Sequence, residues 1–267
     1  MHTSGTRKPP SAEAGYPPAC LRAPDADNKP HAGTTPCSIC RLSPGCLPAQ
    51  LALPDHEKLR AIIRPLPALG RDQTLFEGRS PRDLFILRSG SLKTTVHQEN
   101  GGQQILGFHL PGNVAGFGTG IEDFPGGRIL AMERSSVCAI NLDRLLETAQ
   151  RIDGLQKQLY RLLEDASTLA QQHVLIMGRH DAEARVALFL HDWSRRLRMA
   201  GLNWYDLHLP MRRGEIAGFL GLATETTSRT ISRLQADGIV NVTGRRGLRI
   251  LDPVRLATLA EIDAQHA

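Results

Sequence analysis

Apolar residues between positions 152 and 176 recur at alternating spacings of three and four residues. This spacing is typical of a long helix with a heptad stripe, and a stripe of that length has to be covered by another surface. We therefore expect a helix that pairs with a second copy of itself, although packing lengthwise on its own chain is the alternative. The expected seam consists of Ile152, Leu155, Leu159, Leu162, Ala166, Leu169, His173 and Ile176.

Short apolar runs precede this helix, and turns that contain glycine, such as Ser89-Gly90, separate several of them. Runs of this length with glycine between them are typical of antiparallel strands joined by tight turns. The sequence therefore predicts a small antiparallel barrel or roll. Its expected strands lie at 83–89, 91–97, 103–110, 128–132 and 135–141.

The segment after residue 210 has the pattern of a helix-turn-helix. A first helix is expected at about 213–220, Gly221 would supply the tight turn, and Thr224 could cap the second helix. This arrangement places the second helix in the major groove of double-stranded DNA. Residues 240–251 would form a hairpin wing whose tip carries Arg245 and Arg246, both suited to phosphate contacts.

Charge supports a polyanionic partner for this part of the chain. Residues 179–249 hold twelve arginines, no lysine and seven acids, a net of +5 that equals the net charge of the whole chain. Glu225, Ser228 and Arg229 lie at i, i+3 and i+4, so they share one helix face and could read bases, while Arg233 one turn later would contact backbone. The alternatives are an ordinary solvated basic surface and a purely structural Glu-Arg pair.

Three cysteines, Cys37, Cys40 and Cys46, are spaced C-x2-C-x5-C, which favours metal or redox chemistry over disulfide stapling. A structural zinc site normally has two cysteine knuckles, and this chain offers one, whereas iron-sulfur clusters are held by four thiolates at less regular spacings. Cys138 is the remaining thiol in a segment expected to be ordered. It could be the fourth ligand or an ordinary buried cysteine.

These motifs together resemble the CRP/FNR superfamily of bacterial regulators, and most closely its FNR type, the fumarate and nitrate reduction regulators. The resemblance extends over about 37–259. It depends on the cysteine run 37–46, the stretches 85–93 and 107–112, Ser136-Val-Cys138, and Glu225-Thr-Thr-Ser-Arg229. It implies an α+β fold: an N-terminal antiparallel β-roll like a cyclic-nucleotide-binding domain, a long dimerisation helix, and a C-terminal winged helix-turn-helix.

The functional expectations also come from this resemblance. It implies a 4Fe-4S cluster on Cys37, Cys40, Cys46 and Cys138, a homodimer that responds to oxygen, control of anaerobic gene expression, and an operator similar to TTGAT-N4-ATCAA. It also implies contact with RNA polymerase through roll loops, for which 99–102 is a candidate, and no enzyme activity.

A cyclic nucleotide is not expected as a ligand. The cyclic-nucleotide branch of the superfamily has a Gly-Glu pair in the roll, and here Phe117 follows Gly116, which leaves Arg128 as an isolated signal. Other departures from the FNR pattern are Arg41 and Gly45 inside the cysteine run, and Thr227 and Thr230 at positions where relatives bury aliphatic residues.

We expect five segments. They are a disordered arm at 1–36 that includes Cys20, a cysteine loop and roll at 37–142, the dimerisation helix at 143–178, the winged helix-turn-helix at 179–254, and a tail at 255–267. No window approaches the roughly 18 apolar residues of a membrane span, and no secretory signal is present, which predicts a cytoplasmic protein without a membrane partner. Zinc or a thiol-disulfide switch on the same fold remains an alternative. An iron-sulfur electron carrier is a third, although no nucleophile elbow, phosphate loop or dinucleotide fingerprint supports an enzyme.

Overall fold

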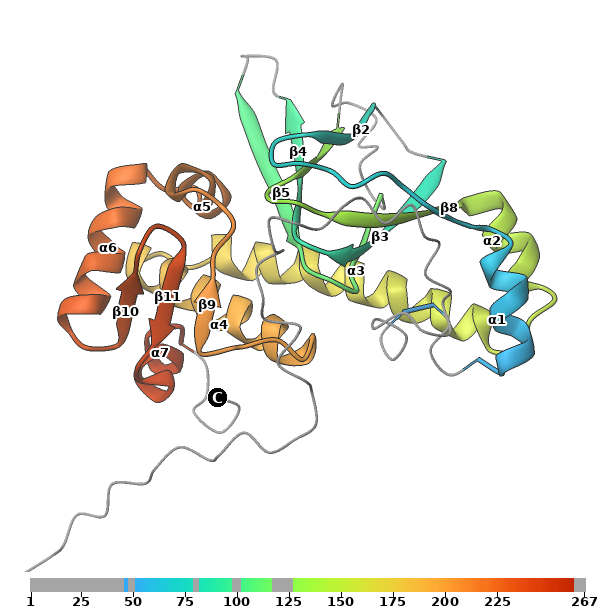
Figure 1. Cartoon of the computed structure of the whole chain (residues 1–267). Coiled ribbons are helices and arrows are strands. Elements are labelled where there is room, and N and C mark those ends of the chain that lie inside the picture. The colour runs from blue at the N-terminus through green and yellow to red at the C-terminus, as the bar shows by residue number, and fades with distance from the viewer. Residues whose placement is uncertain (1–45, 48–50, 79–81, 98–101, 117–126, 262–267) are drawn as a thin grey trace, which may run out of the picture.

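The structure is a computed structural model that describes residues 46–47, 51–78, 82–97, 102–116 and 127–261. An N-terminal β-roll and a C-terminal helical domain lie side by side, and one long helix, α3 (Leu155–Met177), runs along both of them (Figure 1). This is the predicted α+β architecture. Among the described residues no helix is both long and apolar enough to cross a membrane.

In the described part of the roll, the strands form two four-stranded antiparallel sheets. The first has the order β1-β8-β3-β6 and the second the order β2-β7-β4-β5. The strands are β1 (Ile63–Pro65), β2 (Thr74–Gly78), β3 (Asp83–Ser89), β4 (Leu92–His97), β5 (Gln103–His109), β6 (Val114–Ala115), β7 (Gly127–Ala131) and β8 (Ser136–Asn141). The five strands predicted from apolar runs are confirmed, and the short strands β1, β2 and β6 were missed.

Strand β3 explains why its sequence is a continuous apolar run. Phe85 and Leu87 face a core shared with β4, β7 and β8, while Leu84 and Ile86 face a second core under the helices. Because the strand is buried on both faces, it lacks the alternation of a half-exposed strand.

The segment expected to be one dimerisation helix contains two helices, α2 (Leu142–Ala149) and α3. Gly154 at the start of α3 has a φ of 82°, a left-handed conformation that suits glycine. Ile152 therefore lies in the break between the helices and not in α3.

The predicted seam faces its own chain. Ile152, Leu155 and Leu162 are buried in the core under the roll, and Ile176 is buried in the core of the helical domain. Leu159, Ala166, Leu169 and His173 are half-buried on the same side. Four of the eight residues expected in a seam between two chains are therefore buried within their own chain, and for these four the assignment is corrected. Their spacing fits a helix that crosses two domains of one chain, which was the alternative interpretation. The assignment of Leu159, Ala166, Leu169 and His173 to the seam stays a prediction.

The C-terminal domain contains four helices and a three-stranded sheet. The helices are α4 (Ala182–Met199), α5 (Arg213–Leu220), α6 (Thr224–Ala236) and α7 (Pro253–Leu259), and the strands are β9 (Asp206–His208), β10 (Val240–Thr243) and β11 (Gly247–Ile250). Its core extends to Ile105 and Phe108 of β5, so the roll and this domain share buried apolar surface. A short N-terminal helix, α1 (Leu53–Arg60), packs beside the roll.

Candidate nucleic-acid interface and metal centre

Helices α5 and α6 form the predicted helix-turn-helix. Gly221 ends α5 with φ 62° and ψ 36°, the left-handed cap that allows the chain to turn sharply into α6. A Cβ atom built on Gly221 would lie 2.8 Å from Cε of Met177, at the end of α3. Glycine is therefore favoured here by the left-handed backbone conformation, because the methyl end of Met177 belongs to a flexible side chain that can move aside. The predicted first helix and turn are confirmed.

Helix α6 exposes the three side chains that the sequence predicts to read bases, a role that stays a prediction. Glu225 and Arg229 are exposed and Ser228 is half-exposed, while Ile231 and Leu234 on the opposite side are buried in the domain core. No salt bridge joins Glu225 to Arg229 in the described part of the chain. The two side chains therefore do not form the structural ion pair that was the alternative interpretation. The guanidinium of Arg229 is therefore available to bases or phosphates, and the carboxylate of Glu225 to base amino groups.

The start of α6 differs from the prediction, and one of its buried side chains carries a polar group. Thr224 is the first residue of the helix and not its cap, because the N-cap position is Ala223 and makes no side-chain hydrogen bond. The hydroxyl of Thr227 is buried and has no hydrogen-bond partner among the described residues, since the side chain occupies a core position. Arg233 is exposed one turn beyond Arg229.

The wing consists of β10 and β11, as predicted, with Arg245 and Arg246 exposed in the turn between them. Sequence reasoning missed β9, the third strand of this sheet, although Leu207 and Leu209 alternate with polar residues around it. The guanidinium of Arg249 donates two 2.8 Å hydrogen bonds to the carboxylate of Asp206, and these bonds lower the pKa of Asp206. This pair ties the wing to β9.

The cysteine site is described in part. Cys37 and Cys40 lie outside the described residues, as do Cys20, Arg41 and Gly45. Cys46 and Cys138 are each half-buried. Both pack against one hydrophobic cluster, whose members include Leu47, Ile152 and Leu155. Cys138 is in the middle of β8, paired with Pro65 of β1 and Ile86 of β3.

Among the described residues no group of three or more His, Cys, Asp or Glu side chains is placed to hold a metal ion. The donor set that includes the undescribed cysteines nevertheless fits an iron-sulfur cluster, because four thiols are the ligands such clusters use. Two of them, 92 positions apart in sequence (138 minus 46), pack against one cluster of side chains.

The fold and the exposed α6 face define a DNA-binding transcription regulator, in which a winged helix-turn-helix is joined to a roll of the cyclic-nucleotide-binding type. Family models match both parts: a Crp-like helix-turn-helix domain at residues 184–259 and a cyclic nucleotide-binding domain at 68–151. The chain belongs to the CRP/FNR family of transcription regulators, and these proteins are not enzymes.

Relatives in the family include the transcriptional activator protein anr of Pseudomonas aeruginosa. It is 37% identical over 226 residues, which cover 84% of this chain and 92% of that protein. The fumarate nitrate reduction regulatory protein of Klebsiella oxytoca is 34% identical over 213 residues, 78% of this chain and 84% of that protein. Among solved structures, FixK2 from Bradyrhizobium japonicum is similar with a TM-score of 0.64 and 28% identity, covering 74% of this chain and 97% of that one.

The roll shares its fold with cyclic-nucleotide-binding domains, and the expectation that no cyclic nucleotide binds here stays a prediction. Arg128, the candidate for a nucleotide phosphate, is in an ion pair of 2.6 Å with Glu77 on the neighbouring strand β2. Phe117, which follows Gly116, lies outside the described residues.

Proposed function

We propose that this protein is a homodimeric transcription regulator that responds to oxygen through a 4Fe-4S cluster held by Cys37, Cys40, Cys46 and Cys138. The observation that carries the proposal is the packing of Cys46 and Cys138 against one cluster that also contains Leu155, the first residue of α3. The names of two relatives support it: an anaerobic regulatory protein of Haemophilus influenzae and the fumarate nitrate reduction regulatory protein of Klebsiella oxytoca.

The side chains around the two cysteines connect the cysteine loop to the long helix. Leu47, next to Cys46, is 1% exposed and packs in the cluster with Ile152 and Leu155. Leu51 lies 3.7 Å from the position of a Cβ built on Gly154, the N-cap of α3. A bound cluster would supply a redox-active link between the cysteine loop and β8. Through these contacts, a shift of the loop would displace the start of α3.

We place the dimer interface on the outer face of α3. Exposed side chains recur there at spacings of three and four residues, a second heptad stripe that the described chain leaves uncovered. Val174 is 71% exposed and Tyr160 is 76% exposed, and they lie on one stripe with Leu163 and Met177, whereas scattered exposed apolar residues would carry no meaning. The stripe consists of Tyr160, Leu163, Ser167, Ala170, Val174 and Met177.

The dimer would present two α6 helices to two half-sites of double-stranded DNA similar to TTGAT-N4-ATCAA. Arg229 can donate two hydrogen bonds to guanine, Glu225 can accept one from cytosine N4, and Ser228 can take either role. Thr224 and Arg233 on α6, with Arg245 and Arg246 on the wing, would contact backbone phosphates. RNA polymerase would be contacted through loops of the roll, and control of anaerobic genes in the cytoplasm would follow.

The experiment is anaerobic purification of the full-length chain with iron, sulfide and zinc assays and an absorbance spectrum. We expect about four iron and four sulfide per chain, and loss of both in Cys138→Ala. Cys20→Ala is the matched control and should keep the cluster. Stoichiometric zinc without sulfide would replace this proposal by the zinc alternative, and full cluster content in Cys138→Ala would remove Cys138 from the ligand set.

A further inference from the structure

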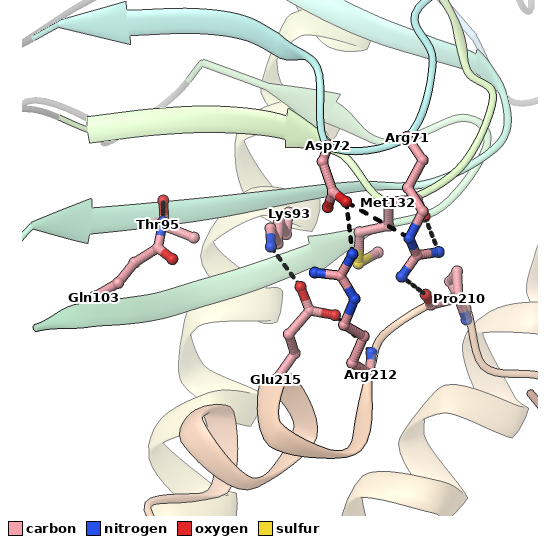
Figure 2. Close-up of polar contacts among 9 residues, drawn as sticks. All are labelled: Arg71, Asp72, Lys93, Thr95, Gln103, Met132, Pro210, Arg212 and Glu215. Atoms are coloured by element: carbon pink, nitrogen blue, oxygen red, sulfur yellow. Dashed lines mark hydrogen bonds and ion pairs between the residues drawn. The ribbon is translucent and has the colours of Figure 1, made fainter. Parts of the chain in front are cut away.

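Three polar bridges join the roll to the start of the helix-turn-helix (Figure 2). We propose that the most buried one, between Lys93 of β4 and Glu215 of α5, is a positioning device that fixes the angle of the helix-turn-helix on the roll. In the dimer this angle sets the spacing of the DNA half-sites that can be read together. The inference rests on the proposed DNA-binding dimer.

The Lys93–Glu215 bridge is an ion pair removed from solvent. Nζ of Lys93 lies 2.5 Å from Oε1 of Glu215, and the two side chains are only 8% and 13% exposed. They are 122 positions apart in sequence and come from different domains. A buried charge needs a partner in a defined geometry, so this contact tolerates little sliding, unlike the apolar surface around it.

Glu215 also fixes the first turn of α5. Its other carboxylate oxygen, Oε2, accepts a 2.5 Å hydrogen bond from the backbone N–H of Arg212, the N-cap residue. This is half of a capping box, in which a side chain at the third helical position satisfies a donor before the helix. One carboxylate therefore starts α5 and attaches it to β4.

Two further bridges lie beside it. The guanidinium of Arg212 donates to Oδ2 of Asp72 at 2.6 Å, and Arg71 donates to the carbonyl of Pro210 at 3.1 Å and to the carbonyl of Met132. Asp72 has a φ of 63°, a left-handed conformation that aspartate tolerates better than most residues. The roll thus contacts the chain before α5 at two further points, both on the same side of the Lys93–Glu215 pair (Figure 2).

The far end of α5 is held by aromatic packing. The ring of Phe219 lies 4.9 Å from Phe108 of β5 and 3.9 Å from His173 of α3, measured between ring centroids. Its carbonyl oxygen also lies 2.8 Å from Nε2 of His173. Both ends of α5 therefore contact the roll or the long helix, and these contacts restrict the rotation of α5.

Helix α6 follows α5 after the turn at Gly221 and packs against it. A rotation of α5 would therefore carry the base-reading face of α6 with it. In a dimer, a change of one base pair between half-sites moves them by about 3.4 Å and about 36°. An angle fixed by the Lys93–Glu215 pair would favour one spacing, and removal of the pair would relax that preference.

The test compares full-length, anaerobically purified proteins on fluorescent duplexes TTGAT-Nn-ATCAA in which n is three, four or five. Binding is measured by anisotropy at one salt concentration, and a thermal melt checks each fold. Glu215→Gln removes the charge while the amide oxygen can still accept from Arg212, and Lys93→Met removes the other charge. Glu77→Gln is the matched control, because Glu77 pairs with Arg128 inside the roll.

We expect the unsubstituted protein and Glu77→Gln to bind the preferred spacer at least about tenfold more tightly than the others. In Lys93→Met and Glu215→Gln this ratio should fall to about threefold or less. If the Lys93–Glu215 pair had a purely structural role, its removal would lower stability and leave the spacer preference unchanged. Folded Lys93→Met and Glu215→Gln variants that keep the full tenfold preference would therefore overturn the inference. If Glu215→Gln does not fold, Lys93→Met and the double variant Lys93→Met/Glu215→Gln decide the question by the same ratio. Failure of the unsubstituted protein to prefer any palindrome over random DNA would instead contradict the proposed function.

Discussion

His109 and Thr94 are joined across β5 and β4, with 2.8 Å between Nε2 of the imidazole and Oγ1 of the hydroxyl. Nδ1 of the same ring is buried and has no hydrogen-bond partner among the described residues. The pKa of His109 is lowered to about 4, mainly because the ring is buried and to a smaller extent because the positive guanidinium of Arg196 lies nearby. A neutral imidazole is therefore part of the packing between the roll and α4.

This relationship predicts a loss of stability in acid. Because the pKa is lower in the folded state than in the unfolded state, the unfolded chain binds more protons below about pH 6.5, and stability falls as the pH drops toward 4. For His109 alone the free energy of unfolding should be about 2 kcal/mol lower at pH 5 than at pH 7. Urea titrations at both pH values measure this difference in the free energy of unfolding. If the difference between pH 5 and pH 7 is the same in His109→Gln, another group is responsible for it.

The buried hydroxyl of Thr227 predicts a stabilising substitution. Thr227→Val keeps the shape of the side chain and removes an oxygen that has no partner within the described structure, so the free energy of unfolding should rise by about 1 kcal/mol. Chemical denaturation measures the change. Thr226→Val, at an exposed position of the same helix, is the control and should change stability little. A destabilised Thr227→Val would mean that the hydroxyl is satisfied.

The two faces of α3 should respond differently to substitution. Leu162 is 9% exposed on the inner face, so Leu162→Ala should lower the free energy of unfolding by about 2–5 kcal/mol through a cavity. Val174→Glu on the outer face should leave the folded chain intact and convert dimer to monomer. Sedimentation velocity separates the two effects. Dimeric Val174→Glu would refute the assignment of the outer stripe as the dimer interface.

The sequence predicted the roll, the helix-turn-helix turn at Gly221 and the wing, because each depends on a local pattern of apolar residues, glycine and spacing. It did not predict which face of α3 is covered. Both stripes have heptad spacing, and only the tertiary structure shows that His173 packs on Phe219 while Val174 faces outward. The Lys93–Glu215 pair was missed for the same reason, since no local signal connects residues 122 positions apart.

The arginines of the DNA interface should divide into two kinds. Arg229→Ala should weaken binding to the predicted palindrome by about 1–3 kcal/mol and reduce discrimination at one base pair. Arg245→Ala on the wing should weaken binding to all sequences alike and lower the slope of log affinity against log salt by about one. Anisotropy titrations at several salt concentrations measure both. Equal effects of the two substitutions on sequence discrimination would contradict the assignment.

The most direct test of the central claim is operator binding by one anaerobic preparation, measured before and after exposure to air together with its iron and sulfide content. We expect the affinity for the palindrome to fall at least about tenfold as the cluster is lost, because a monomer reads only one half-site. Cys138→Ala should bind weakly both before and after exposure. Tight binding that persists after iron and sulfide are gone would contradict control of DNA binding by the four cysteines.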